Sequence, residues 1–363
     1  MPVKTALVTI GWLMIAATAI PLIRKDAWWI RVFDFPRAQI VVVSAVVLIT
    51  CWFSIESPTG AENVFFVALS ASLAYQGYMM YPYFPFAKKQ VQASKNATKE
   101  SRLSLLTANV LMTNRRADRL RQIIRDIDPD VILTIETDDW WQQKLHDLER
   151  THPFKVLQPQ SNTYGMLLYS RLELIDPKVE FLVQDDIPSI HTRVKLESGQ
   201  QIGLHCMHPR PPSPTEDDNT TDRDAELLLV GRRLEQKEIP AVVMGDLNDV
   251  AWSRTNYLFQ KSSGLLDPRV GRGFFNTFHA RVPFMRFPLD HFFHTNHFRL
   301  IDFERLPYFG SDHFPVFISL SYEPDAEIQQ PKLQANREEK ERAARKIEKA
   351  TSDPNVSKPD TTG

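Results

Sequence analysis

The chain has 363 residues, 43% of them hydrophobic, so it is long enough for more than one structural unit with a buried core. Its formal net charge of -1 gives no bulk electrostatic support for binding a polyanion. Its two cysteines, Cys51 and Cys206, lie far apart in the sequence and exclude a disulfide framework.

The first 87 residues differ in composition from the rest of the chain. Three runs, at about 3–23, 38–55 and 63–86, contain almost no charged residue and approach the length of about 20 residues that a helix needs to cross a bilayer. The alternative is that these runs form buried helices of a soluble all-α domain. Three runs with almost no internal charge disfavour that alternative. We predict an N-terminal bundle of three transmembrane helices, with the lipid bilayer as a partner.

Positive charges are distributed unevenly around these runs. The loop at 56–62 contains no basic residue, whereas the first loop and the segment after the third run are both basic. Their basic residues are Arg24, Lys25, Arg31, Arg37, Lys88, Lys89, Lys95 and Lys99. With three spans both basic segments lie on one side, so the positive-inside rule places the large C-terminal part in the cytoplasm.

From residue 101, after a polar linker at 88–100, short strands alternate with helices as far as residue 323. Helices are expected at 115–127, 138–150 and 222–236. Strands are expected at 103–108, 131–135, 164–170, 190–196, 202–207, 241–244, 289–294, 300–303 and 314–320. Consecutive strands within a mixed order predict an α/β (α+β) domain, with sheets covered by helices, rather than a purely parallel doubly wound sheet. Residues 324–363 are predicted to be a charged, largely disordered tail in which only 338–350 favours a helix.

Polar side chains follow the ends of several of these strands. Any one of them alone is more readily explained as a cap or a solvated loop residue, but acids, amides and imidazoles recurring at strand ends indicate a site. These residues are Asn109, Glu136, His208, Asp246, Asn248, Asp290, Asp312 and His313.

This set of side chains suits the hydrolysis of a phosphate ester. Carboxylate and amide oxygens are hard ligands that favour Mg²⁺, or Mn²⁺, over zinc. An Asp–His pair keeps an imidazole oriented and charged near a phosphate, and a second carboxylate can activate the attacking water. The sequence therefore predicts a metal-dependent phosphoesterase.

Residues 101–323 resemble the endonuclease/exonuclease/phosphatase superfamily, which includes DNase I-like nucleases, inositol-phosphate phosphatases and neutral sphingomyelinases. The resemblance is carried by Gly-Asp-Leu-Asn at 245–248 and Gly-Ser-Asp-His at 310–313. The segments 207–212 and 287–293 are similar to membrane-anchored bacterial members, which implies a multi-pass protein of a bacterial inner or plasma membrane. The fold implied is a four-layer sandwich of two packed β-sheets flanked by helices.

The resemblance also implies roles for the motif residues. It makes Glu136 the principal metal ligand, with Asn109 and Asp312 beside the same ion. The remaining assignments are Asp246 as the residue that activates water, Asn248 as a phosphate contact, His313 as a contact to the scissile phosphate oriented by Asp290, and His208 as a second catalytic histidine.

The segment 269–286 interleaves arginines with phenylalanines between two of the motifs. It is either an ordinary solvated loop or a phosphate-facing rim that includes Arg272 and Arg286, and its aromatic residues would suit stacked bases or a lipid chain. Two readings of the substrate therefore stay open, a nucleic acid and a lipid or small-molecule phosphate. The alternative function is a catalytically inactive, membrane-tethered binding module, although no motif residue is missing.

Overall fold

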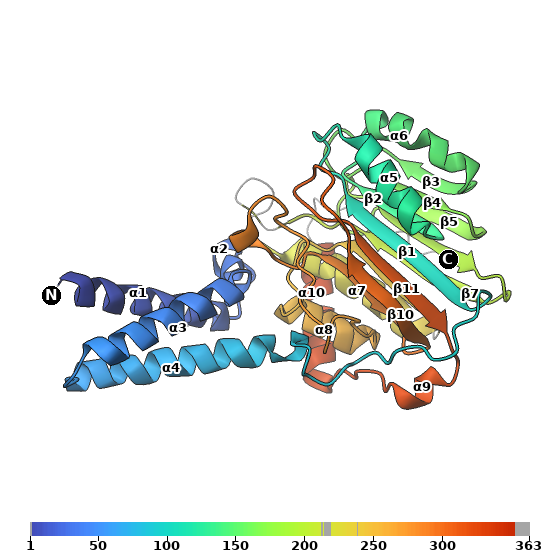
Figure 1. The fold of residues 1–363 in the computed structure, drawn as a ribbon. Helices are drawn as coiled ribbons and strands as arrows, with labels where there is room; N and C mark the ends of the chain where they lie inside the picture. The colour runs from blue at the N-terminus through green and yellow to red at the C-terminus, as the bar shows by residue number, and fades with distance from the viewer. Residues whose placement is uncertain (1, 212, 214–218, 238, 353–363) are drawn as a thin grey trace.

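The computed structural model of the chain describes residues 2–211, 213, 219–237 and 239–352. An elongated bundle of N-terminal helices is attached to a domain of two β-sheets with helices on their outer faces (Figure 1). The N-terminus lies at the far end of the bundle, away from the domain.

The domain contains a six-stranded and a five-stranded sheet. Strand order is β10-β11-β1-β2-β4-β3 in the first and β5-β6-β7-β8-β9 in the second. Each sheet is mixed, because β1 and β2 pair in parallel, as do β7 and β8, while their other neighbours are antiparallel. The strands are β1 Arg102–Asn109, β2 Val131–Ile135, β3 Phe154–Gln158, β4 Met166–Ser170, β5 Leu174–Glu180, β6 Ser189–Lys195, β7 Gln201–Met207, β8 Ala241–Asp246, β9 Asp290–His294, β10 Phe298–Arg305 and β11 Val316–Tyr322.

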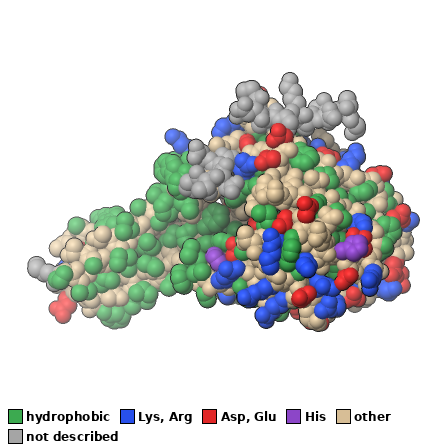
Figure 2. All heavy atoms as spheres, turned by 90° about the horizontal axis from the view of Figure 1, so that it is seen from above, with side chains coloured by type: hydrophobic (Ala, Val, Ile, Leu, Met, Phe, Trp, Pro, Cys, Tyr) green, Lys and Arg blue, Asp and Glu red, His purple; other side chains and the backbone are tan. Residues whose placement is uncertain are grey.

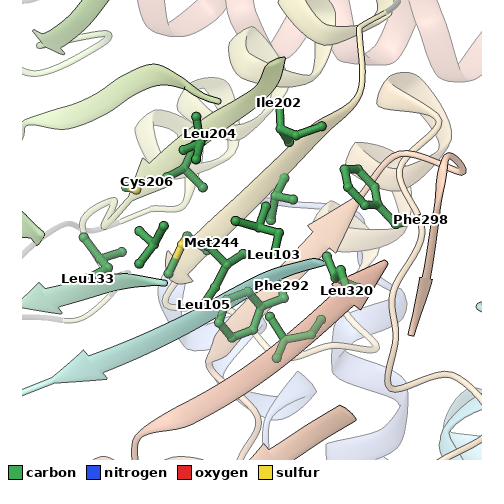
Figure 3. Close-up of a cluster of buried hydrophobic side chains, with 14 of the residues drawn as sticks. Leu103, Leu105, Leu133, Ile202, Leu204, Cys206, Met244, Phe292, Phe298 and Leu320 are labelled. Carbon is green, nitrogen blue, oxygen red and sulfur yellow. The ribbon is translucent and has the colours of Figure 1, made fainter. Parts of the chain in front are cut away.

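The main hydrophobic core lies between the two sheets. Side chains such as Leu105 and Leu133 from one sheet meet Leu204, Met244 and Phe292 from the other, and all are fully buried (Figure 3). Because successive side chains of a strand point to opposite faces, the alternate residues form two further cores under the helices. This arrangement confirms the prediction of two packed sheets flanked by helices.

Helices cover the outer face of each sheet. Helices α5 (Ala117–Ile127) and α6 (Asp139–Leu145) pack on the six-stranded sheet. The five-stranded sheet is covered by α7 (Thr221–Lys237) and α8 (Arg254–Ser263), and α10 (Arg337–Thr351) packs against both of these helices. The domain therefore has four layers.

The N-terminal bundle consists of three long helices, α1 (Pro2–Ala19), α3 (Arg37–Ser54) and α4 (Gly60–Met80), with the short α2 (Trp28–Arg31) near the domain. Within the described residues, two helical segments are long and apolar enough to cross a membrane, Pro2–Leu22 and Arg37–Ser54. By length and composition alone such helices also occur in soluble cores and signal sequences. The third predicted span falls on α4, which is long enough but carries Glu62 and Gln76 and does not meet the same test.

Two segments predicted to be outside the folded domain are part of it. In the expected linker, Val91 is fully buried, and residues 92–94 run beside β10, where the Ser94 amide donates to the Leu300 carbonyl at 2.8 Å. In the expected tail, the helix favoured at 338–350 is present as α10, and its apolar residues Ala343, Ile347 and Ala350 pack on α7. The short helix α9 (Ala326–Gln329) was not expected. Residues 353–363 of that predicted tail lie outside the described residues.

Candidate active site

The predicted site residues come together at one edge of the two sheets. Asn109 ends β1, Glu136 directly follows β2, and Asp246 ends β8. Asp246 is paired in register with Asp290, the first residue of β9, so both carboxylates are held by strand pairing. Polar groups at the carboxyl ends of the two parallel strand pairs therefore face a common point, as the sequence predicted.

His313 lies between two buried carboxylates. Its Nδ1 is 2.8 Å from Oδ2 of Asp290, and its Nε2 is 3.5 Å from Oδ2 of Asp246. Burial alone would lower the pKa of His313, but Asp290 and Asp246 raise this pKa to about 10. The imidazole is therefore protonated at neutral pH. It donates from Nδ1 to Asp290, while its Nε2 faces Asp246 at ion-pair distance and is free to donate to a further group.

Asp246, Asp290 and His313 each have a possible metal-ligand atom, and these three atoms lie within 4.8 Å of one another, a spacing that could hold a metal ion. A protonated imidazole has no free lone pair for a metal, and its positive charge offsets one of the two negative charges beside it. We therefore interpret Asp290, His313 and Asp246 as an array of alternating charges, in which Asp290 is hydrogen-bonded to His313 and Asp246 is at ion-pair distance from it.

An oxygen-rich cluster lies next to this array. Nδ2 of Asn109 donates to Oε1 of Glu136 at 2.7 Å and to Oδ2 of Asp246 at 3.1 Å. Burial raises the pKa of Glu136 to about 7, and the negative charges of Asp312 and Asp246 contribute to this rise. Carboxylates that destabilise one another's charge in this way fit a position for a hard divalent cation, whose ligands would come from Glu136, Asn109 and Asp312.

The turn after β8 aims Asp246 into the site. Gly245 has a φ of +139°, and a Cβ atom there would lie 2.0 Å from the carbonyl oxygen of Met207 on the neighbouring strand. Only glycine is accommodated, which explains why the strand ends in Gly-Asp. The amide of Asn248 then donates to Oδ1 of Asp246 at 2.9 Å and fixes the carboxylate.

Asn248 and His208 occupy the five-stranded side of the site. Nδ2 of Asn248 donates to the carbonyl of Pro209 at 2.9 Å. Pro209 directly follows His208, so this bond ties Asn248 to the segment that carries His208. The ring of His208 is buried 5.3 Å from that of Tyr164, and burial lowers the pKa of His208 to about 4. His208 is therefore a neutral imidazole beside the protonated His313.

The two arginines predicted to bind substrate differ in position. The guanidinium of Arg286 lies over the ring of Phe314, 5.1 Å from the ring centroid. Phe314 is the residue that follows His313 in the chain. Arg272 instead donates to the carbonyls of Val91 and Pro268, at 2.5 and 3.1 Å, and these contacts lie outside the network of Asp246 and His313. Arg286 is thus the better placed of the two.

Two hydroxyl groups that the sequence analysis did not single out organise the site. Oγ of Ser311 donates to the carbonyl of Asn109 at 2.8 Å and accepts from the amide of His313 at 3.0 Å. Oγ1 of Thr277 accepts from the amides of Leu289 and Asp290, each at 3.2 Å. Ser311 belongs to the Gly-Ser-Asp-His segment at 310–313. Thr277 is a single hydroxyl residue in a loop, and nothing in the sequence around it indicates a role.

The chain was compared with known proteins. A model of the Endonuclease/Exonuclease/phosphatase family matches residues 106–313. The human nocturnin catalytic domain with bound sulfate is similar in structure at 17% identity and a TM-score of 0.51, covering 62% of this chain and 96% of that one. D. rerio TDP2 complexed with single-strand DNA product has 16% identity and a TM-score of 0.50, covering 61% of this chain and 99% of that one. At this identity both show a shared fold, and no curated protein matches the chain.

Proposed function

Because the chain belongs to the Endonuclease/Exonuclease/phosphatase family, we propose that it is a membrane-anchored, divalent-metal-dependent phosphoesterase that hydrolyses phosphate mono- or diesters. The observation that carries this proposal is the array of Asp290, His313 and Asp246 beside the oxygen-rich cluster around Glu136. Hydrolysis needs the phosphate charge neutralised and a water molecule positioned, and the two halves of the site offer these separately.

Glu136, Asn109 and Asp312 would hold the metal ion. Their oxygen atoms favour Mg²⁺, with Mn²⁺ as a substitute, over zinc. When bound, the ion supplies positive charge to the phosphate oxygens as negative charge builds up on them. The raised pKa of Glu136, which results from burial and neighbouring carboxylates, supports a cation at this position.

Asp246 is the residue we assign to the attacking water. Its carboxylate takes a proton from the water, the water oxygen forms a bond to phosphorus, and the bond from phosphorus to the alcohol oxygen breaks. The alcohol leaves with a proton from solvent. His313, protonated and held by Asp290, donates a hydrogen bond to a phosphate oxygen and stabilises the transition state.

His208 and Asn248 complete the phosphate environment in this proposal. His208 has a neutral ring, so it offers one donor and one acceptor rather than a positive charge. Asn248 is held by its bonds to Asp246 and Pro209, which would leave its amide at a fixed position beside the phosphate. Both roles are positioning and hydrogen bonding.

The surface of the helical bundle supports a membrane anchor. On α3, the residues Val42, Val46, Ile49 and Phe53 follow one another at helical spacing and are 61%, 56%, 58% and 82% exposed. Viewed from above, the bundle presents mainly hydrophobic side chains, whereas charges are concentrated on the domain (Figure 2). Exposing an apolar surface of this kind to water raises the free energy of the protein, whereas contact with lipid chains does not.

The substrate class we favour is a phosphate ester presented at the bilayer surface. The loop that carries Arg281 and Arg286 has an apolar tip, where Phe284 is 72% and Met285 47% exposed. This tip contacts the first turn of α3, because Nε2 of Gln39 donates to the carbonyl of Phe284 at 2.6 Å. The loop therefore joins the neighbourhood of the catalytic His313 to the membrane helices.

A substrate panel on the full chain in detergent tests this function. The panel holds supercoiled DNA, single-stranded DNA, a soluble phosphodiester and a micellar lipid phosphate, each with Mg²⁺ or EDTA. We expect EDTA-sensitive hydrolysis of the lipid phosphate, and Asp246→Ala should lower it by about 10³-fold or more. The matched control is Asp302→Ala, which removes an exposed carboxylate from β10.

The other outcomes of the panel separate the remaining readings. EDTA-sensitive cleavage of DNA alone would change the substrate class to nucleic acid and leave the catalytic assignment intact. Equal activity of Asp246→Ala and the parent would overturn the site. Failure to hydrolyse any member of the panel would favour the alternative, an inactive binding module with this fold.

A further inference from the structure

A cavity of about 430 Å³ lies where the helical bundle meets the domain, away from the catalytic residues. One wall comes from the end of α4 and the short helix Tyr81–Tyr83, and another from residues 251–258 at the start of α8. The linker between α1 and α2 and the first half of α10 close the remaining sides with Arg24 and Arg342. Four segments that are distant in sequence thus build one hollow.

Three arginines line this cavity without a partner. Arg24, Arg254 and Arg342 come from three different elements, and none forms an ion pair or a side-chain hydrogen bond with any residue in the described ranges. A smaller hollow that shares all three arginines adds Lys25 and Lys346. The cavity is therefore strongly cationic on one side.

The acidic groups nearby are already occupied. Glu339 lines the cavity, but its carboxylate caps α10 by accepting from the amide of Asn336 at 2.8 Å. Asp26 lines the smaller hollow and pairs with Nζ of Lys346 at 2.7 Å. Neither acid neutralises the three arginines.

Arg254 shows that the uncompensated charge is partly withdrawn from water. Its side chain is half-buried, and burial lowers the pKa of Arg254 from its ordinary value. The negative charge of Asp34 also acts on Arg254, but Asp34 already pairs with Arg31 and Arg37. An arginine stays protonated in proteins, so a half-buried guanidinium whose neighbouring carboxylate is already paired favours an external anion.

The rest of the cavity is apolar and aromatic. Tyr78 and Tyr81 are 76% and 53% exposed at the domain end of α4, and Trp252 and Tyr257 face them across the hollow. Tyrosine and tryptophan concentrate where lipid head groups meet the hydrocarbon region. The cavity thus combines a cationic wall with an apolar wall at the end of the helical bundle that adjoins the domain.

We propose that this cavity binds an anionic phospholipid of the surrounding bilayer, with its phosphate between Arg254 and Arg342 and an acyl chain along α4. The inference rests on the membrane anchoring proposed above but not on the hydrolytic activity. Because residues 251–253 line the cavity and follow the Asp246 turn closely in the chain, the lipid would fix the active-site edge of the domain relative to the membrane.

Lipid retention by the full chain tests this site. The protein is purified in mild detergent, incubated with equal amounts of phosphatidylglycerol and phosphatidylcholine, and examined by native mass spectrometry. We expect one phosphatidylglycerol molecule to be retained in preference to phosphatidylcholine. In Arg254→Gln/Arg342→Gln the preference should fall about thirtyfold, since each basic residue at a bilayer surface contributes roughly fivefold. Inorganic phosphate at millimolar concentration should not displace the lipid.

A matched control and a second variant keep the test decisive. Arg345→Gln changes an arginine one turn further along α10 that is 65% exposed and should retain lipid as the parent does. Arg24→Gln, in another segment, should lower retention about fivefold even if the double variant is unstable. Equal retention of both lipids by the parent, or unchanged retention in all variants, would overturn the site. Hydrolysis of a soluble phosphodiester, measured in parallel, reports separately on the proposed function.

Discussion

At the residue scale, the candidate site depends on the charge of His313. Burial opposes that charge, and the imidazolium exists only because two carboxylates contact it on opposite sides. Asp290 is the closer of the two: its side chain holds Nδ1 at 2.8 Å, while its backbone amide donates to Thr277 and its strand pairs with that of Asp246. An isosteric change can therefore remove the charge of Asp290 and keep its backbone pairing with Asp246, the residue proposed to activate water.

Asp290→Asn should lower kcat by about 10³-fold with KM almost unchanged, and it should also lower Tm, because the buried imidazolium of His313 loses the closer of its two carboxylates. The amide preserves the shape of the side chain but removes the charge that orients His313 and keeps it protonated. Steady-state hydrolysis and a thermal melt of parent and variant provide the measurement, with Asp302→Asn on the exposed face of β10 as control. A kcat within twofold of the parent would show that His313 acts without this carboxylate.

Sequence could predict most of this site because each residue stands at a strand end with its own chemical signature. Asp246, Asp290 and His313 needed only the expectation that neighbouring strand ends meet. The hydroxyls of Ser311 and Thr277 could not be assigned roles in the same way, since their roles depend on which backbone amides fold back to them. The position of Arg272 near a motif did not indicate its contacts, because its side chain bonds to the carbonyls of Val91 and Pro268.

At the element scale, one largely buried lysine of α10 contacts two other segments of the chain. Nζ of Lys346 contacts Asp26 at 2.7 Å and Asp224 at 2.8 Å, so it connects α10 to α7 and to the linker between α1 and α2. Burial alone would raise the pKa of Asp224, but Lys346 and Arg223 lower it below its usual range. This ion pair holds against the domain a helix that the sequence favoured at 338–350 but placed in a largely disordered tail.

Lys346→Met should reduce the free energy of unfolding by about 2 kcal/mol, because Asp224 stays buried with Arg223 as its remaining cation. The folded-state pKa of Asp224 lies below its unfolded value of about 3.9, so its contribution is present above pH ~4 and is lost as pH falls through the folded pKa. The variant should therefore lose less stability than the parent on acidification from pH 5.

The control for this prediction is Lys340→Met on the same helix. Lys340 pairs with Glu235 of α7 at the same distance, 2.8 Å, but the two side chains are 57% and 46% exposed. An exposed pair contributes about 0–1 kcal/mol, so this variant should melt close to the parent. Equal melting temperatures of the two variants between pH 3 and 7 would contradict a special role for Lys346.

The elements that the sequence analysis missed are those with weak periodicity. Strands β3 and β5 lie at the edges of their sheets, and β5 contains Asp176-Pro177 and a bulge between Ile175 and Lys178. Edge strands tolerate proline and need no continuous apolar face, so they resemble loops in sequence. The central strands, buried on both faces, were predicted because their apolar runs are continuous.

At the scale of the whole molecule, the two ends of the helical bundle carry different charges. The end remote from the domain carries the ion pair of Lys4 with Glu62 and the exposed Glu56. The end next to the domain carries Arg24, Lys25 and, in a buried network with Asp34 and Gln76, Arg37. Helices α1 and α3, at 18 residues each, are about 27 Å long, close to the thickness of a hydrocarbon core.

This asymmetry predicts which end of the bundle faces outward. A membrane-impermeant maleimide applied to intact cells should label Ser57→Cys, in the exposed loop between α3 and α4, and should leave Lys95→Cys unlabelled until the membrane is permeabilised. The native Cys51 and Cys206 are buried, so they contribute little background. Labelling of Lys95→Cys alone in intact cells would reverse the orientation. It would also move the active site, which lies on the same side as the basic residues, to the outer face. Labelling of both positions before permeabilisation would mean that the bundle does not cross the membrane.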